Sequence, residues 1–221
     1  MGLYEPAITN VETRYRGYLC FKRFQDVALS ILALIVLSPF LLLISLAIVI
    51  DDPKGGPIFS QTRVGKNGRL FPIYKFRTMK ADAKSPGGML SPEELFEYRK
   101  EFKLNQDPRV TRMGNFLRRS SIDEIPQLIN IVLGHMSLIG PRPLLPEEVQ
   151  EKYTEPEQRL LLSLRPGLTG LWQVKGRSQC TYESGERQKA ELYYVQNYSP
   201  RLDFTILLHT VRAIVKGDGA M

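Results

Sequence analysis

Cysteine and histidine are scarce in this sequence, and their scarcity narrows the classes of protein it can encode. The chain has 221 residues but only two cysteines, Cys20 and Cys180, and two histidines, His135 and His209. These four residues cannot build a disulfide framework or a thiolate zinc site, and the histidines lack metal-ligand spacing. The sequence also has no G-x-x-x-x-G-K-[ST] loop and no dinucleotide-binding glycine motif. A disulfide-stapled domain and a P-loop enzyme are excluded, and a zinc or dinucleotide enzyme is not supported.

Acidic residues are outnumbered by basic ones, 23 to 30, which gives a formal net charge of +7. A basic balance indicates anionic partners: nucleic acid, anionic lipid or phosphorylated small molecules. Hydrophobic residues make up 43% of the chain and charged residues 24%, which are ordinary values for a globular protein.

Charge is absent from residues 27–50, which read VALSILALIVLSPFLLLISLAIVI. A membrane-spanning helix needs about 20 such residues, so the run is long enough to cross a bilayer. A buried core helix of a soluble protein is the alternative, although such helices seldom lack charge over this length.

Two features of the run favour a helix that enters and leaves the membrane by the same face. Pro39, preceded by Ser38, lies mid-run and should kink the helix, and the Ser38 hydroxyl can bond a freed carbonyl. Basic residues flank both ends, so the positive-inside rule assigns both ends to the cytoplasm. They are Arg14, Arg16, Lys22 and Arg23 before the run, and Lys54, Arg63, Lys66 and Arg69 after it. A straight anchor that tolerates a proline remains the alternative.

Short elements are expected after the run. Residues 58–77 predict a hairpin around Gly-Lys-Asn-Gly, with Pro72 on an edge strand. Ser91 and Glu94 form a capping box that should begin a helix reaching residue 104. Asp107-Pro108 should break this pattern, and a short helix should follow through Arg119. Further helices are expected over 123–134, 147–164, 182–197 and 202–216, with an irregular or strand segment at 167–178. The last helix is amphipathic and could lie in a membrane interface or pack on the core.

Four basic clusters recur among prolines, glycines and aromatic residues: YKFRTMK (74–80), FLRRSSIDE (116–124), GPRPLL (140–145) and LRPGLTGLWQVKGRS (164–178). Arg142 lies between two prolines, and a stiff backbone lowers the entropy cost of presenting a guanidinium to a phosphate. Each cluster alone is more simply explained by helix capping or ion pairing. Four clusters in one chain favour a phosphate-rich site.

Asp123 and Glu124 are the candidate catalytic residues. Ser121 and Glu124 have capping-box spacing, which would place Asp123 in a first helical turn, whereas Pro126 favours Asp123 itself as the cap. In either register the helix dipole favours the carboxylate and a nearby phosphate. An ionised aspartate beside arginines is a plausible nucleophile toward phosphorus, and simple capping by an acidic pair is the alternative.

The chain resembles the bacterial sugar transferases, the monotopic phosphoglycosyl transferases, over about residues 20–216. The resemblance rests on the membrane run with Ser38-Pro39, on YKFRTM, on SSIDEIPQLINIVLGHMSLIGPRPLL and on RPGLTGLWQVKGRS. It implies an α+β, mostly helical protein with a re-entrant membrane helix, a compact cytoplasmic catalytic domain, a small β-hairpin and interfacial amphipathic helices. The corresponding division is an extension (1–19), the membrane helix hairpin (20–52), the catalytic domain (53–216) and a tail (217–221).

The resemblance also implies a two-step reaction. Asp123 would attack the β-phosphorus of a UDP-sugar and release UMP, and polyprenyl (undecaprenyl) phosphate would then take the phosphosugar from Asp123. Glu124 would deprotonate or orient the acceptor, and Mg²⁺ would be the cofactor, with Asp123 as its ligand. The implied phosphate-binding residues are Lys75, Arg77, Arg118, Arg142 and Arg165.

The resemblance places the protein on the cytoplasmic face of the bacterial inner membrane, among membrane lipids, in polysaccharide or glycoconjugate assembly. No nucleic-acid partner is expected, and a homodimer is left open. Residues 100–120 look more like members that use a hexose, such as galactose or glucose, than those that use an acetamido sugar. The alternatives are a non-catalytic scaffold for anionic lipid and a glycosyltransferase that releases UDP.

Overall fold

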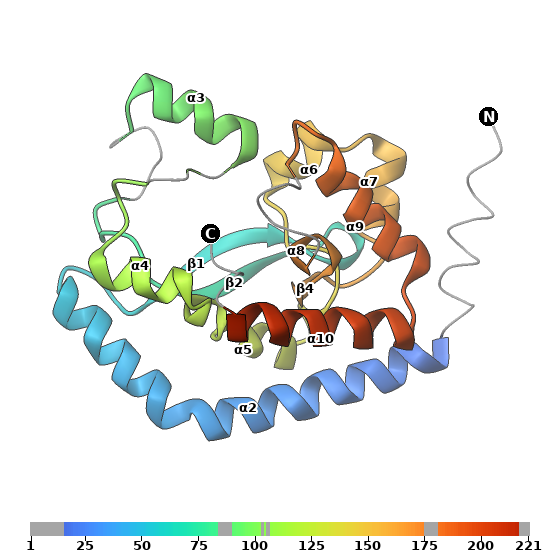
Figure 1. Cartoon of the computed structure of the whole chain (residues 1–221), viewed down its shortest axis with the longest axis horizontal. Helices are drawn as coiled ribbons and strands as arrows, with labels where there is room; N and C mark the ends of the chain where they lie inside the picture. The colour runs from blue at the N-terminus through green and yellow to red at the C-terminus, as the bar shows by residue number, and fades with distance from the viewer. Residues whose placement is uncertain (1–15, 84–89, 103, 105–106, 175–180, 217–221) are drawn as a thin grey trace.

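The structure is a computed structural model that describes residues 16–83, 90–102, 104, 107–174 and 181–216. Four expected segments lie wholly or partly outside the described residues: residues 1–15 of the extension (1–19), most of the loop at 81–90, the end of the fourth basic cluster at 175–178 and the tail (217–221). The described chain is mostly helical with two small sheets, which confirms the predicted α+β, mostly helical class (Figure 1).

The longest element is helix α2, which spans Arg16–Asp51, contains Pro39 and is visibly bent in Figure 1. Pro39 has no N–H to offer the carbonyl of Ile35, four residues earlier. The Ser38 hydroxyl donates to that carbonyl oxygen at 2.8 Å, so the predicted compensation is present. The helix is long and apolar enough to cross a membrane, and little of its apolar window is buried. A buried core helix is therefore ruled out.

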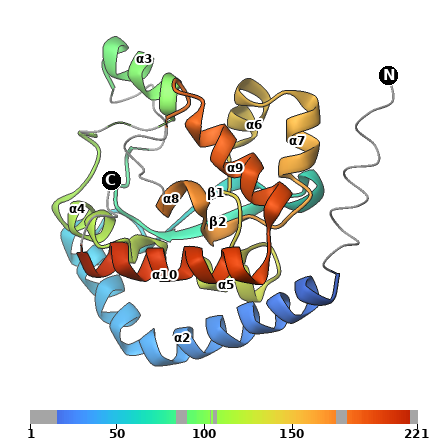
Figure 2. The same ribbon diagram turned by 45° about the vertical axis from the view of Figure 1, so that its right-hand side comes forward.

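The globular part of the molecule packs against both halves of α2. Toward its N-terminal end, Arg23 donates to the carbonyls of Ile131 and Val132 at 2.7 and 3.1 Å. Toward its C-terminal end, Ile44 and Ile48 are buried in a cluster with Phe76 and Leu117, so this end rests on another part of the same globular body. Figures 1 and 2 show α2 running beneath the other elements along its length.

The predicted hairpin is present. Strand β1 (Ile58–Val64) pairs antiparallel with β2 (Leu70–Phe76), and Thr62 faces Pro72. Asn67 and Gly68 adopt positive φ angles of 57° and 76°, the backbone conformation that Asn-Gly accommodates readily. In a sheet of two strands both are edge strands, which is where proline is tolerated.

A second, parallel pair joins β3 (Ser137–Ile139) to β4 (Gly167–Thr169). Gly140 and Gly167 meet there so closely that a Cβ on Gly167 would lie 2.1 Å from the Gly140 nitrogen. This contact brings the Gly-Pro-Arg-Pro segment against the segment after Arg165, which are two of the basic clusters.

The remaining helices are α3 (Pro92–Glu101), α4 (Arg112–Arg119), α5 (Gln127–Val132), α6 (Pro146–Lys152), α7 (Glu155–Leu161), α8 (Leu171–Val174), α9 (Glu186–Asn197) and α10 (Pro200–Lys216). The capping box at Ser91 is confirmed, with reciprocal bonds of 2.7 and 3.2 Å to Glu94. The prediction of one helix over 147–164 is wrong. Tyr153 is extended, and the Thr154 N–H donates to the Glu157 side chain at 2.8 Å, so a second helix starts there.

Helix α10 packs on the core, as one of the two alternatives for the last amphipathic segment expected, and it also exposes apolar side chains. One face buries Asp203 and Ile206 against the core, while other apolar side chains of α10 are exposed: Phe204, Leu207, Leu208 and Val211. In Figures 1 and 2 α10 runs alongside α2. Exposed apolar residues on α2 include Leu32, Ile35, Val36, Leu42, Leu43 and Ile50. Surfaces this apolar indicate a membrane or another apolar partner.

Candidate active site

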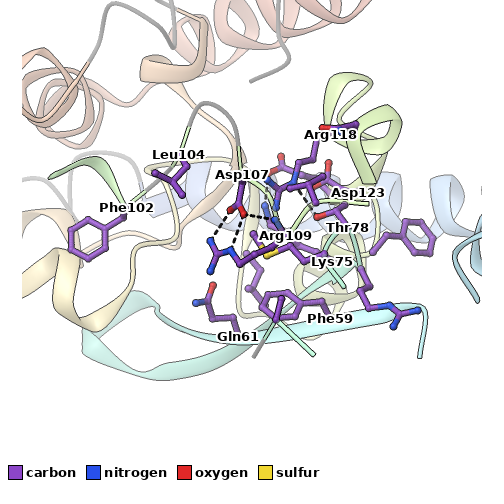
Figure 3. Close-up of a pocket in the computed structure, with 18 of the residues that line it drawn as sticks. Phe59, Gln61, Lys75, Thr78, Phe102, Leu104, Asp107, Arg109, Arg118 and Asp123 are labelled. Carbon is purple, nitrogen blue, oxygen red and sulfur yellow. Dashed lines mark hydrogen bonds and ion pairs between the residues drawn. The ribbon is translucent and has the colours of Figure 1, made fainter. Parts of the chain in front are cut away.

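A cavity of about 1710 Å³ opens between β2, α4, the turn before α5 and the Pro-Arg-Pro segment. Its lining includes most of the predicted site residues: Lys75, Arg77, Arg118, Asp123, Glu124 and Arg142. In Figure 3, Asp123, Arg118, Thr78 and Lys75 lie together on one side of this cavity, whereas Phe102 and Leu104 lie on the other. Residues from four separate stretches of the sequence therefore meet at one place.

Asp123 lies in a 3₁₀ turn, Ile122–Glu124, and is 9% exposed. The first predicted register is confirmed in part, because Ser121 is the N-cap of this turn and Asp123 lies in its first turn, but Ser121 has a left-handed backbone (φ 55°) and its side chain makes no capping bond. The second register is wrong, because Pro126 and not Asp123 occupies the N-cap of α5. The carboxylate therefore precedes α5 by one turn, rather than capping that helix.

Burial, more than any neighbouring charge, raises the pKa of Asp123, to about 6. The nearby Lys75 ammonium lowers this pKa, the Glu124 carboxylate raises it and the Arg118 guanidinium lowers it. At pH 7 Asp123 is still mostly ionised, and it is poorly solvated. A desolvated carboxylate next to cations is a stronger nucleophile than one in bulk water.

Lys75 and Glu124 form an ion pair, with the Nζ and Oε1 atoms 2.7 Å apart and each side chain 27% exposed. Glu124 therefore neutralises Lys75, the cation that lowers the pKa of the candidate nucleophile Asp123. An incoming phosphate at Lys75 would have to share or displace this carboxylate.

Arg77 is held at the end of α2. Its Nη1 lies 3.2 Å from the Asp52 carboxylate, and its Nη2 donates to the Asp52 carbonyl at 2.5 Å. The Asp52 carboxylate also accepts hydrogen bonds from the backbone N–H groups of Ala81 at 2.8 Å and Lys54 at 3.2 Å. These two bonds hold the pKa of Asp52 below its usual value. Arg77 thus lines the cavity while joining the end of α2 to the strand that carries Lys75.

Arg118 is placed by a close contact between α4 and the segment after β2. The Arg118 Nε donates to the Thr78 hydroxyl at 3.0 Å. Gly114 makes this approach feasible, because a Cβ there would lie 2.0 Å from the Thr78 carbonyl oxygen. No ion pair with a carboxylate is recorded for Arg118 among the described residues, so its charge is available to a phosphate.

Arg142 lies on the cavity wall that follows β3, one strand of the parallel β3–β4 pair. Its guanidinium stands 5.2 Å from the ring centre of Trp172, and its backbone N–H donates to Glu191 at 3.0 Å. Across the described chain its guanidinium has no carboxylate within ion-pair distance. Among the predicted phosphate ligands that line the cavity, Arg142 and Arg118 therefore make no direct ion pair with a described carboxylate.

Arg165 is the predicted site residue that the fold does not bring to the cavity. Its Nε donates to the Gly134 carbonyl at 2.9 Å, at the exposed end of α5. It caps that helix end, as basic residues often do. The structure adds cavity residues that lie in none of the four basic clusters: Arg63, Tyr98, Arg109 and Glu148. Trp172, from the fourth cluster, also lines the cavity.

Asp123 is the predicted metal ligand in this cavity. Among the described residues, no three or more His, Cys, Asp or Glu side chains are grouped as metal ligands. Mg²⁺ is commonly held by one or two carboxylates together with substrate phosphates. Asp123, a buried carboxylate on the cavity wall, fits that arrangement.

The chain belongs to the bacterial sugar transferase family, whose model matches residues 17–217. It is 40% identical over 203 residues to the undecaprenyl-phosphate galactose phosphotransferase of Salmonella typhimurium, covering 90% of this chain and 41% of that protein. It is 38% identical over 214 residues to the exopolysaccharide production protein PSS of Rhizobium leguminosarum bv. phaseoli, covering 91% of this chain and 98% of that protein.

The relatives differ in length. An uncharacterized sugar transferase of Haemophilus influenzae is 42% identical over 202 residues, which are 90% of this chain and 42% of that protein. The chain thus spans about two fifths of the longer relatives and nearly all of the short exopolysaccharide protein.

Proposed function

We propose that this protein transfers a sugar 1-phosphate from a UDP-sugar to polyprenyl phosphate and releases UMP. The observation that carries the proposal is the buried Asp123 carboxylate at the basic end of a large cavity, in a molecule with a long exposed apolar helix. The Salmonella relative's name, a galactose phosphotransferase acting on undecaprenyl phosphate, supports the same chemistry and a hexose donor.

The reaction proceeds in two displacements at one phosphorus. An Asp123 oxygen attacks the β-phosphorus of the UDP-sugar, and the bond to the bridging oxygen breaks, so UMP leaves with the electron pair. An oxygen of polyprenyl phosphate then attacks the same phosphorus. The acyl phosphate bond breaks, the Asp123 carboxylate is restored, and polyprenyl diphosphate sugar is released.

The basic residues of the cavity have different roles, according to whether their charges are paired with a carboxylate. Arg118 and Arg142, which have no ion pair among the described carboxylates, hold the donor's phosphates. Lys75 lowers the pKa of Asp123 and keeps the nucleophile ionised. Glu124, paired with Lys75 at 2.7 Å, orients the acceptor phosphate in the second step. When bound, Mg²⁺ would neutralise phosphate charge, with Asp123 as its protein ligand.

Helix α2 serves as a re-entrant anchor. Its two halves contact different parts of one globular body, through Arg23 near one end and through Ile44 and Ile48 near the other. A straight span would carry one of these contacts across the bilayer, whereas a shallow bent helix keeps both on one face. The apolar face of α10 would lie in the same interface, on the cytoplasmic side of the inner membrane.

A product assay tests the proposed function. Purified protein in detergent micelles is incubated with polyprenyl phosphate, Mg²⁺ and a panel of UDP-sugars, and UMP and UDP are quantified separately. We expect UMP with at least one UDP-hexose and none from the matched Asp123→Asn variant. UDP as the product would identify a glycosyltransferase, and lipid binding without nucleotide release would identify a scaffold.

A further inference from the structure

The Pro141-Arg142-Pro143 turn has a single backbone hydrogen-bond donor. Both prolines lack an N–H, so only Arg142 can donate, and its N–H points to the Glu191 carboxylate at 3.0 Å. The carbonyls on either side are also held. Pro141 accepts from the Gly167 N–H at 2.7 Å, and Pro143 accepts from Arg63 at 3.4 Å. Glu191 is therefore the acceptor that fixes the middle of the turn.

Glu191 occupies a position that is unfavourable for a carboxylate. It lies on α9 and is 1% exposed, and its second oxygen, Oε1, has no hydrogen-bond partner among the described residues. Burial is the main reason that its pKa is raised, to about 7. A buried acid with one unmatched oxygen contributes little to stability, and a well-packed apolar residue often does better. A role in the site would account for its presence.

The side chain of Arg142 is also connected to α9 through a series of side-chain contacts that begins at Trp172. The Trp172 ring contacts two guanidinium groups, with its centre 5.2 Å from that of Arg142 and 4.9 Å from that of Arg187. Arg187, also on α9, is ion-paired with Glu148 at 3.2 Å. Glu148 in turn pairs with Arg63, which holds the Pro143 carbonyl. The turn is thus enclosed by a ring of buried charged and aromatic side chains.

We propose that Glu191 is a positioning residue that holds Arg142 in the orientation needed to bind the donor's phosphate. This inference rests on the proposed function, because it assumes that Arg142 binds the uridine nucleotide. Glu191 acts through the backbone of Arg142 and does not touch substrate.

If Glu191 acted only through its charge, its removal would change the affinity for UMP in the opposite direction. Removing a carboxylate near Arg142 makes the site more positive, which would strengthen binding of an anion. Loss of orientation weakens binding instead. The sign of the change in affinity therefore separates positioning from a simple effect of charge.

The test is a double-mutant cycle on the dissociation constant of UMP and on kcat/KM for the UDP-sugar. Glu191→Leu removes the acceptor and the buried charge while filling the space, and thermal melting verifies that it folds. We expect Glu191→Leu and Arg142→Ala each to weaken UMP binding about tenfold, with little further loss in the double variant. Glu191→Gln keeps an acceptor oxygen and should stay within about threefold of the wild type.

A matched control separates positioning from general damage to the core. Asp203 is another buried carboxylate, 5% exposed, that accepts from the Tyr194 hydroxyl at 2.8 Å. Any effect of Asp203→Ala on UMP binding should add fully to that of Arg142→Ala. Additive losses for Glu191→Leu, or tighter UMP binding, would overturn the inference. Failure of the wild type to bind or release UMP would instead overturn the proposed function.

Discussion

Two buried glutamates near the Pro-Arg-Pro turn should respond to pH in opposite directions. Burial raises the pKa of Glu191 to about 7, from 4.5 when unfolded. The charged groups that face it are Arg142, Arg187 and Glu148. Between about pH 4.5 and 7 the folded state retains a proton that the unfolded state has lost, so stability falls as pH rises through this window.

The size of the effect follows from the pKa difference. A shift of about 2.5 units at 1.36 kcal/mol per unit means that ionised Glu191 costs up to about 3 kcal/mol above pH 7. Glu191→Gln should therefore raise the free energy of unfolding by up to that amount at pH 8, and by less than about 1 kcal/mol at pH 5. For a chain of this length the rise in Tm at pH 8 would be roughly 5–10 °C.

Glu148 provides the matched control. It is as buried as Glu191, but the guanidinium groups of Arg142 and Arg187 outweigh the effect of burial and hold its pKa below the usual value. Its contribution is present above the unfolded pKa and is lost as pH falls through the folded pKa. Glu148→Gln should lower stability at pH 8 by roughly 3 kcal/mol, because the buried Arg63 and Arg187 lose their ion-pair partner.

The assay is thermal unfolding in detergent, followed by circular dichroism at pH 5 and pH 8 for the wild type and both variants. Opposite signs at pH 8 are the expected result. A Glu191→Gln protein that melts below the wild type at pH 8, or whose gain is the same at both pH values, would refute the reasoning on buried charge.

Three further outcomes are expected at the membrane and the cavity. If α2 is re-entrant, Cys20 (with the other native cysteine replaced) and a cysteine at Lys54 should react with an impermeant thiol reagent from the same side of sealed vesicles. Labelling from opposite sides would show a straight span. Arg142→Lys keeps the charge but loses the planar two-pronged donor, so kcat/KM should fall about tenfold with an unchanged Tm; a wild-type value would remove Arg142 from the site. In a metal-free NMR titration, Asp123 should be half-protonated near pH 6, and Lys75→Met should move this midpoint upward. A midpoint near 4 would show that Asp123 is not desolvated.

The features that short-range chemistry dictates could be predicted from the sequence. The bond from Ser38 to the carbonyl freed by Pro39 follows from neighbouring residues, as does the positive φ of Asn67 and Gly68 in the hairpin turn. The split between α6 and α7 could also have been found. Residues 154–157 have the capping pattern that was recognised at Ser91, but it lies inside a continuous helical pattern.

The parts of the site that depend on tertiary packing could not be read from local motifs. Arg165 comes just before β4, which pairs with the strand that precedes Arg142, yet its side chain turns to the end of α5. Glu191 comes from a helix with no recognisable motif and is separated from Arg142 by about fifty residues. The register at Asp123 depends on Ser121, whose left-handed backbone no capping rule anticipates.

The central claim is that Asp123 becomes covalently bonded to the phosphosugar. The most direct measurement is intact-protein mass spectrometry with peptide mapping, after incubation with UDP-sugar and Mg²⁺ but no lipid acceptor. The wild type should gain the mass of one phosphosugar on Asp123 and release up to one equivalent of UMP, and Asp123→Asn should do neither. An adduct that maps to Glu124, or normal turnover with lipid in a wild type that never forms an adduct, would contradict this account.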